Sequence, residues 1–167
     1  MKNDALIKKI EEAIGQLLLD KSLTVSIAES CTGGLISSRL TDISGSSAYI
    51  KLNLVTYSNE AKVKMLGIEL DLIKNYGAVS EQVALEMAKG ARKIACTDIG
   101  IGVTGIAGPM GGTPEKPVGL VYIGIASDKY SEVHKVNISS ELSRIEIKYQ
   151  ASQRALEVLK DFILRQF

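Results

Sequence analysis

The sequence has no tryptophan, a single histidine (His134) and only two cysteines among its 167 residues. With one histidine, neither a multi-histidine metal centre nor a Ser-His-Asp triad is expected. The cysteines, Cys31 and Cys96, do not form a CxxC pair, so they predict neither a disulfide framework nor a zinc site. Metal centres, catalytic triads and disulfides built from cysteine or histidine are therefore not expected in this chain.

The chain also lacks an excess of charge of one sign and a long apolar run. Its formal net charge is +1, with both signs spread along the sequence, which does not favour binding of nucleic acid through bulk charge. The N-terminal residues lead into a charged amphipathic helix, so neither a signal peptide nor a membrane span is expected. A cytoplasmic location is the resulting expectation.

What the chain does have is the composition of an ordinary globular protein, with 46% hydrophobic and 23% charged residues. Residues 1–167 are expected to form one domain with a substantial core. Apolar periodicity predicts strands near residues 23–29, 48–57, 98–104, 118–127 and 129–138, and helices near 4–19, 32–41, 61–66, 70–76, from Ser80 onward, and 140–165. The early strands alternate with helices and the last two are adjacent. This order predicts an α/β fold, a three-layer α/β/α sandwich with a mixed, mostly parallel sheet.

The stretch Ala28–Gly34 lies between the first predicted strand and the second predicted helix. It contains two candidate nucleophiles, Ser30 and Cys31, followed by two glycines. The start of a helix offers free backbone N–H groups, which suit an anion or a developing oxyanion. Because sites in α/β folds collect where strands end, residues 56–62 and 104–117 are expected to lie near this turn.

A serine needs a base to become a nucleophile, and without a histidine pair lysine is the obvious one. Lys62 would require a pKa lowered by burial or by a neighbouring cation, and Tyr57 could relay a proton between Ser30 and Lys62. The alternative is that Ser30 caps a helix and Lys62 is solvated. Two rivals remain: Ser58 with Lys62, four residues apart on one helical face, and Cys31 as the nucleophile.

The segment Gly105–Pro117 is rich in glycine and holds all three prolines of the chain. Such a loop can wrap a phosphate or ribose with its N–H groups, although it lacks the GKS or GKT ending of a nucleotide-triphosphate loop. Arg144 and Lys148 are four residues apart on the last predicted helix and can meet an anionic substrate. The alternatives are a rigid surface loop and a solvated helical face. The C-terminal helix is expected to bury Ile145, Tyr149, Leu156, Leu159 and Ile163.

Five segments in this order together resemble one family. They are Ala28–Gly34 (AESCTGG), Gly45–Ser47 (GSS), Val55–Lys62 (VTYSNEAK), Gly77–Glu81 (GAVSE) and Gly105–Pro109 (GIAGP). The chain is similar, from about residue 5 to residue 165, to the CinA C-terminal domain family, which includes stand-alone nicotinamide-mononucleotide amidohydrolases.

The resemblance implies hydrolysis of the carboxamide of nicotinamide mononucleotide (NMN) to nicotinate mononucleotide and ammonia, without a metal or other cofactor. It implies a Ser/Lys machinery on Ser30 and Lys62, assisted by Tyr57. Substrate-binding positions would be Ser47, Thr104, Gly105 and Arg144. Either Ser30 or Ser47 would be the nucleophile, and the strand-to-helix position favours Ser30. The implied partner is the nucleotide substrate, with neither nucleic acid nor membrane, and a homodimer is an additional expectation.

One departure from the family pattern affects the last helix. The family shows a second arginine where this sequence has Lys148, and lysine offers a point charge where arginine offers a fork. Weaker phosphate affinity would follow, which leaves open a nucleotide-binding or interaction module with little activity. The molybdopterin-binding-like domain of full-length CinA proteins does not precede this sequence, so activities resting on that domain are not expected.

Overall fold

A computed structural model describes the backbone of residues 2–167 and the side chains of residues 10–167. Five strands form one sheet in the order β2-β1-β3-β4-β5. The strands are β1 (Val25–Glu29), β2 (Ile50–Val55), β3 (Ile99–Gly105), β4 (Leu120–Ala126) and β5 (Ser131–Asn137). The helices are α1 (Lys2–Asp20), α2 (Leu35–Thr41), the short η1 (Ser46–Ala48), α3 (Asn59–Leu66), α4 (Leu70–Tyr76), α5 (Glu81–Ala95) and α6 (Arg144–Gln166).

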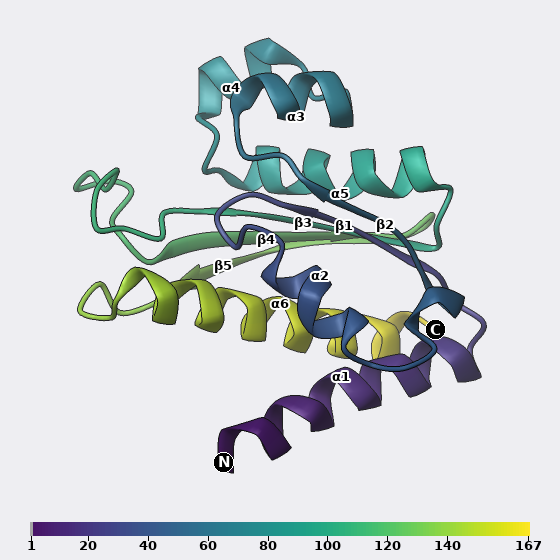
Figure 1. The fold of residues 1–167 in the computed structure, drawn as a ribbon. Helices are drawn as coiled ribbons and strands as arrows, with labels where there is room; N and C mark the ends of the chain where they lie inside the picture. Colours follow the sequence, from purple (N-terminus) through teal and green to yellow (C-terminus); the bar gives the residue numbers. More distant parts are fainter. Residues whose placement is uncertain (1) are drawn as a thin grey trace.

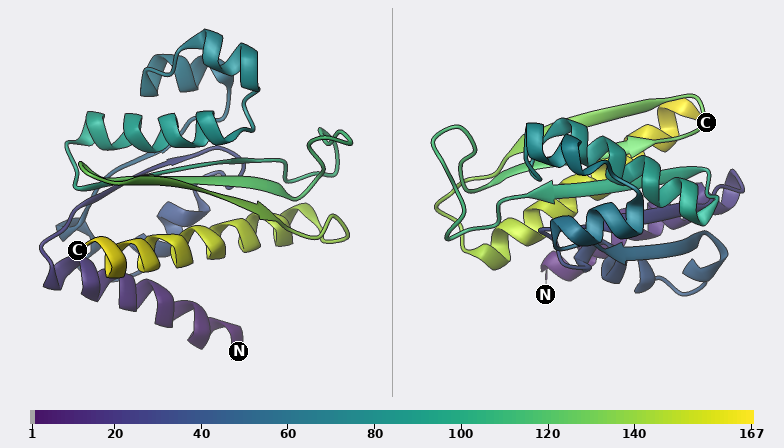
Figure 2. Two further views of the ribbon diagram at one scale, coloured as in Figure 1. Left: turned by 180° about the vertical axis from the view of Figure 1, so that it is seen from behind. Right: turned by 90° about the horizontal axis from the view of Figure 1, so that it is seen from above.

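Helices cover both faces of the sheet (Figure 1). Helix α5 lies directly on one face with α3 and α4 outside it, and α1, α2 and α6 cover the other face (Figure 2). Strand β1 pairs in parallel with β2 and β3, whereas β3–β4 and β4–β5 are antiparallel. The predicted three-layer α/β/α class with a mixed sheet is therefore confirmed, with the parallel pairs at the β2 side.

Glycines let α5 approach the sheet closely. A Cβ built on Gly102 would lie 2.4 Å from the carbonyl oxygen of Ala84, and one on Gly124 would lie 2.3 Å from the same oxygen. Any larger residue at either position would push α5 away from β3 and β4. The apolar runs of these strands are thus buried on this face by backbone as well as by side chains.

Serine caps fix where three helices begin. Ser58 accepts a hydrogen bond from the N–H of Ala61 at the start of α3, and Ser80 accepts one from the N–H of Val83 at the start of α5. Ser143 forms a reciprocal capping box with Glu146, which starts α6 at Arg144.

The first turn of α6 corrects one part of the predicted core. Ile145 is 79% exposed, whereas Ile147 is buried. The first turn of α6, which includes Ile145, is exposed, and the buried residues of the helix begin at Ile147 and include Leu156, Leu159 and Ile163. Ile145 instead points to solvent near the end of the sheet that carries the candidate site.

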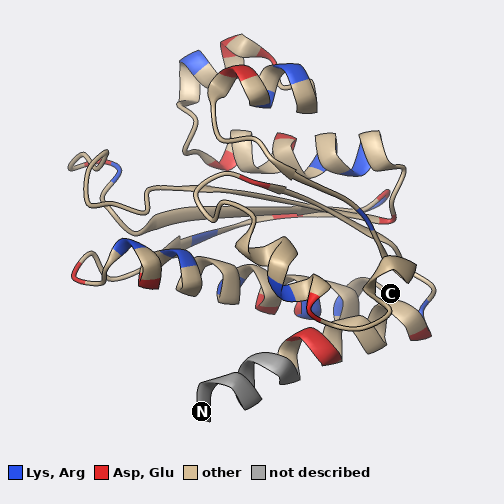
Figure 3. Ribbon diagram, viewed as in Figure 1, with Lys and Arg blue, Asp and Glu red and all other residues tan. Residues whose placement is uncertain are grey.

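Charges of both signs are distributed over the helices on either face of the sheet (Figure 3). Among the described residues, no helix combines the length and apolar character needed to cross a membrane.

Candidate active site

A cavity of about 260 Å³ lies where β1, β2 and β3 end. Of the residues singled out in the sequence, Ser30, Cys31, Tyr57, Lys62, Thr104, Gly105 and Arg144 line it. Its other lining residues include Asn59, Val79 and Met110, which sequence reasoning did not single out. Asn59 belongs to the quoted VTYSNEAK motif, so its place beside Tyr57 and Lys62 was the available signal.

Ser30 and Lys62 are in direct contact. The Nζ atom of Lys62 lies 3.0 Å from the Oγ atom of Ser30 and 2.8 Å from the carbonyl oxygen of Thr56. Ser30 directly follows β1, where its N–H donates to the carbonyl of Val103 in β3. Lys62 comes from the first turns of α3, which the Ser58 cap places just after β2. Helix and strand ends thus bring the two groups together across 32 residues of sequence.

Burial decides the protonation chemistry of Lys62. Its side chain is 1% exposed, and this desolvation lowers the pKa of Lys62 below its ordinary value of 10.5. Among the described side chains, no carboxylate forms an ion pair with it. The alternative of a solvated lysine is therefore wrong. The Ser58–Lys62 rival is also wrong, because the Ser58 hydroxyl is exposed and caps α3.

The start of α2 is occupied by a carboxylate of the protein itself. Glu29, the last residue of β1, accepts hydrogen bonds from the backbone N–H groups of Gly34, Ile36 and Ser37, and from the Ser37 hydroxyl. The expectation that these helix N–H groups face a ligand is therefore wrong. From the sequence, Glu29 is expected at the end of the first predicted strand, with no partner assigned to its side chain.

The turn before α2 has N–H groups that Glu29 does not take. Within the described part of the chain, the backbone N–H groups of Cys31 and Thr32 donate no hydrogen bond to another residue. Both follow Ser30 directly. The side chain of Ser30 does not cap α2, whose N-cap is Gly34 without a side-chain bond. The two N–H groups are the available donors beside the candidate nucleophile.

The neighbouring thiol is held in its neutral form. Burial, and then the nearby charge of Glu29, raise the pKa of Cys31 to about 12. A thiol with that pKa is protonated near neutral pH, and the thiolate is the reactive form. The Cys31 rival to Ser30 is therefore disfavoured by its environment.

Tyr57 lies in the cavity but not between Ser30 and Lys62. Its hydroxyl accepts a hydrogen bond of 2.8 Å from Arg144, which also donates to the carbonyl of Gly108 at 2.7 Å. Since Lys62 already contacts Ser30 directly, the predicted proton relay through Tyr57 does not match this arrangement. The Tyr57 side chain, 60% exposed, instead forms part of the cavity wall.

The structure does not bring Ser47 to the cavity. Ser47 is exposed in η1, which precedes β2, whereas the cavity lies beyond the other end of that strand. Strand β2 has six residues, so at about 3.3 Å per residue it separates Ser47 from the cavity by roughly 20 Å. The parallel register of β1 and β2 fixes this separation, because Glu29 lies beside Val55 and Val25 beside Ile50.

Two predicted binding residues line the inner part of the cavity. The buried hydroxyl of Thr104 donates to the carbonyl of Ala78 at 2.9 Å. Gly105 follows it at the end of β3, and a Cβ built there would lie 2.7 Å from the carbonyl oxygen of Leu120. Thr104 therefore offers the cavity an acceptor oxygen, and Gly105 keeps the strand close to its neighbour.

The loop after β3 is tied down at two points. Arg144 of α6 holds Gly108, as described above, and the Nζ atom of Lys116 donates to the carbonyls of Tyr76 and Val79 at 2.7 and 2.8 Å. Lys148 does not line the cavity. Its Nζ atom lies 3.3 Å from the position that a Cβ of Gly33 would take, so its charge is beside the Ser30 turn. Among the described side chains, no three His, Cys, Asp or Glu residues gather to hold a metal ion.

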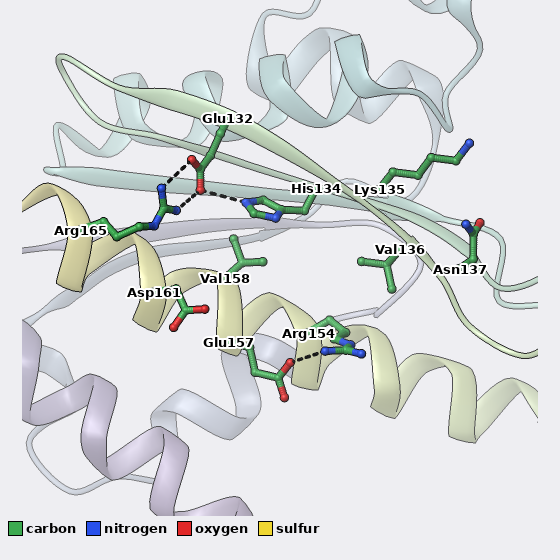
Figure 4. A pocket seen from close by; sticks show the side chains of 10 residues that line it. All are labelled: Glu132, His134, Lys135, Val136, Asn137, Arg154, Glu157, Val158, Asp161 and Arg165. Atoms are coloured by element: carbon green, nitrogen blue, oxygen red, sulfur yellow. Dashed lines mark hydrogen bonds and ion pairs between the residues drawn. The ribbon is translucent and has the colours of Figure 1, made fainter.

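A larger groove of about 610 Å³ lies between β5 and α6 (Figure 4). His134 lies in it and contacts Glu132 at 2.9 Å, and Glu132 also pairs with Arg165. Arg154 and Glu157 form a further pair at 2.9 Å on α6. Most charged side chains of the groove are thus paired with one another, and the residues that line it include no serine, threonine or cysteine.

Comparisons with known proteins extend the sequence resemblance. The family model of the CinA C-terminal domain matches residues 7–163. A "CinA-like protein" of Endomicrobium trichonymphae is 51% identical over 87% of this chain and 34% of its own length. A protein of Caldicellulosiruptor saccharolyticus, named "Putative competence-damage inducible protein", is 49% identical over 93% of this chain and 37% of its own length. The chain thus spans little more than a third of these curated relatives.

Solved structures agree with the fold over nearly the whole chain. The competence/damage inducible protein CihA of Agrobacterium tumefaciens superposes with a TM-score of 0.85 at 44% identity, covering 90% of this chain and 93% of that one. The competence damage-inducible protein A (ComA) of Klebsiella pneumoniae superposes with a TM-score of 0.92 at 27% identity, covering 96% and 99%.

Proposed function

The chain belongs to the CinA C-terminal domain family, and from that premise we propose that it is an amidase acting through Ser30 and Lys62. The proposed reaction is hydrolysis of the carboxamide of NMN to nicotinate mononucleotide and ammonia. The observation that carries the proposal is the 3.0 Å contact between the Ser30 hydroxyl and a buried lysine without a carboxylate partner among the described side chains. The choice of NMN as the substrate rests on the family resemblance.

In the first half-reaction, neutral Lys62 donates one N–H to the carbonyl of Thr56 and turns its lone pair to the Ser30 hydroxyl. Lys62 takes the hydroxyl proton as Ser30 Oγ bonds to the carboxamide carbon. The π electrons of the carbonyl move to its oxygen, and the N–H groups of Cys31 and Thr32 stabilise the oxyanion. Lys62 then returns the proton to the departing nitrogen, the C–N bond breaks, and ammonia leaves an acyl-Ser30 ester.

The second half-reaction uses the same groups in the same order. Lys62, neutral again, accepts a proton from a water molecule whose oxygen attacks the ester carbon. The oxyanion collapses, the bond to Ser30 Oγ breaks, and the proton on Lys62 returns to the serine. The acid that forms gives its remaining proton to solvent, where ammonia takes it up, so the two steps consume one water and release nicotinate mononucleotide as a carboxylate with one ammonium ion.

The wall of the cavity offers groups suited to the rest of a mononucleotide. The Tyr57 ring provides a flat surface for stacking of a pyridine ring. Arg144 uses two of its N–H donors for Gly108 and Tyr57, and a guanidinium has five, so donors remain for a phosphate. We assign the phosphate end of the substrate to the side of the cavity formed by Arg144.

The proposal is tested by measuring ammonia release from NMN with the purified protein and with Ser30→Ala and Cys31→Ala. Wild type should release ammonia, and Ser30→Ala should lower kcat by at least about 1,000-fold, because the nucleophile is removed. Cys31→Ala should stay within about fivefold of wild type, since a neutral thiol contributes no nucleophile. An inert wild type, or full activity of Ser30→Ala, would refute the proposal.

The second candidate is a nucleotide-binding module with little turnover. The observation that favours it is Lys148, which stands where the family pattern has an arginine and whose ammonium lies beside Gly33 rather than in the cavity wall. A rise in melting temperature with NMN, without ammonia release, would support this candidate over the amidase.

A further inference from the structure

Glu29 is a fully buried carboxylate that has no cation partner among the described side chains. We propose that it is a positioning residue, which holds the turn after β1 so that Ser30 faces Lys62 and the N–H groups of Cys31 and Thr32 face the substrate. The inference rests on the proposed amidase function and adds to it the part of the structure that shapes the oxyanion site.

Both carboxylate oxygens of Glu29 accept hydrogen bonds from residues at the start of α2. Oε2 accepts from the N–H groups of Gly34 and Ile36, each at 3.1 Å, and Oε1 accepts from the N–H and hydroxyl of Ser37 at 2.8 and 2.6 Å. All four partners are donors, so the site requires a group that only accepts. An ionised carboxylate meets this requirement, whereas an amide would place its own NH₂ donors against one set of these donors.

Starting a helix with a buried carboxylate requires that the carboxylate be desolvated, so its presence here needs a reason. A short Ser, Thr, Asp or Asn at the N-cap satisfies the first N–H groups without burying a charge on a strand. Here the N-cap is Gly34, without a side-chain bond, and the capping group comes from five residues earlier. Burying a carboxylate costs several kcal/mol before its hydrogen bonds offset it. The arrangement ties the end of β1 to the start of α2 on either side of Ser30.

The tie determines what the intervening turn can do. Residues 30–33 must close between two fixed ends, with Gly33 and Gly34 in the left-handed region at φ +64° and +96° and the N–H of Gly33 on the carbonyl of Ser30 at 3.1 Å. Glu29 also removes the N–H groups of α2 from competition for an oxyanion. The donors left beside Ser30 are those of Cys31 and Thr32, and their direction is set by this closed turn.

Glu29 therefore acts on geometry and not on the base. The lowered pKa of Lys62 has burial as its cause, and no contact joins Lys62 to Glu29. Removing the charge of Glu29 should misdirect the serine and the oxyanion donors while the proton affinity of Lys62 is retained. A displacement of about 1 Å in such a group costs on the order of 100-fold in rate.

The experiment compares Glu29→Gln with Glu11→Gln in the full chain. Glu11 is the matched control, because it is also buried and also holds α2, through its 2.6 Å pair with Arg39, but it lies away from the cavity. Glu29→Gln should lower kcat for NMN about 100-fold, with KM within threefold and with the lower limb of the pH–rate profile unmoved. Glu11→Gln should lower the melting temperature but leave kcat within threefold.

A second readout does not depend on the identity of the substrate. The rate at which a fluorophosphonate probe labels Ser30, followed by mass spectrometry, should fall about 100-fold in Glu29→Gln and little in Glu11→Gln, because the phosphonyl oxygen uses the same oxyanion donors. A wild type that is labelled but releases no ammonia would refute the NMN proposal, and the labelling rates would still decide the role of Glu29.

If Glu29→Gln does not fold, Ser37→Ala provides the milder variant, since it removes one of the four bonds to the carboxylate and keeps the backbone. It should lower the labelling rate about threefold to tenfold, with KM unchanged. Labelling within twofold of wild type in Ser37→Ala or Glu29→Gln, or an equal loss in Glu11→Gln, would overturn the inference.

Discussion

Two buried basic side chains lie on opposite faces of the sheet, and their hydrogen-bond partners differ in kind. Arg39 of α2 donates to Glu11 at 2.6 Å, to Ser152 at 2.8 Å and to Gln153 at 2.7 Å, and its guanidinium lies 5.1 Å from the centre of the Tyr149 ring. Lys62 of α3 contacts only the neutral oxygens of Thr56 and Ser30. Arg39 thus has a counter-charge, whereas Lys62 does not.

The difference shows how burial produces either structure or reactivity. A guanidinium remains charged under all ordinary conditions, so its burial requires a carboxylate and full hydrogen bonding. An amine can lose its proton, so burial without a carboxylate lowers its pKa and makes a base. Arg39 therefore joins α1, α2 and α6, whereas Lys62 serves as the base for Ser30 in the proposed mechanism.

The strongest test of this comparison is to place a permanently charged guanidinium, like that of Arg39, at the position of Lys62. Lys62→Arg keeps a basic side chain near Ser30 but makes its charge permanent, so that it cannot accept a proton at neutral pH. Ammonia release from NMN should fall by at least about 1,000-fold, because the general base is lost. Circular dichroism establishes that the variant is folded, and activity within tenfold of wild type would contradict a role of Lys62 as base.

The converse change removes the cation from the structural region. Arg39→Met leaves Glu11 buried without its counter-charge, so the free energy of unfolding should fall by about 3 kcal/mol. Because Arg39 is not part of the cavity, kcat for NMN should stay within threefold at a temperature where the variant is folded. Urea unfolding followed by circular dichroism measures the first effect, and an unchanged midpoint would mean that the Arg39 cluster contributes little to stability.

The smallest expected effect is a pH dependence of kcat/KM that reports on Lys62 and not on Arg39. Lys62 must be neutral to accept a proton, so kcat/KM should rise about tenfold per pH unit below its folded-state pKa and level off above it. The apparent pKa should lie below 10.5 because burial disfavours the charged amine. Arg39→Met should keep the same limb. A rate that falls with rising pH across this range would contradict the assignment.

Much of the site could be predicted because it depends on where strands end. Ser30 follows β1 and Lys62 follows β2, and two adjacent parallel strands place their carboxyl ends together. The same rule places Ser47, which precedes β2, at the far edge. The family resemblance assigned Ser30, Ser47 and Lys62 to one site and did not distinguish the two ends of β2. The register of β1 against β2 shows that Ser47 lies at the opposite end from Ser30 and Lys62.

Other features depend on side chains that reach across several residues, which periodicity does not describe. Glu29 reads as the last polar residue of a strand, yet its carboxylate replaces the expected ligand at the start of α2. Ile145 has helical spacing typical of the core, but it lies in the first turn of α6, which is exposed. Tyr57 is predicted to relay a proton, but its hydroxyl accepts a hydrogen bond from Arg144. For Glu29 and Tyr57, a side-chain hydrogen bond overrides what the pattern predicts.

The loop after β3 is held on both sides of its exposed middle. Gly108 is anchored to Arg144 and Lys116 is anchored beside Val79, whereas Met110, between them, is 86% exposed. Met110 is thus the exposed middle of a loop that is held on both sides. A phosphate bound by the remaining donors of Arg144 would therefore meet a guanidinium whose position is already fixed by Gly108 and Tyr57.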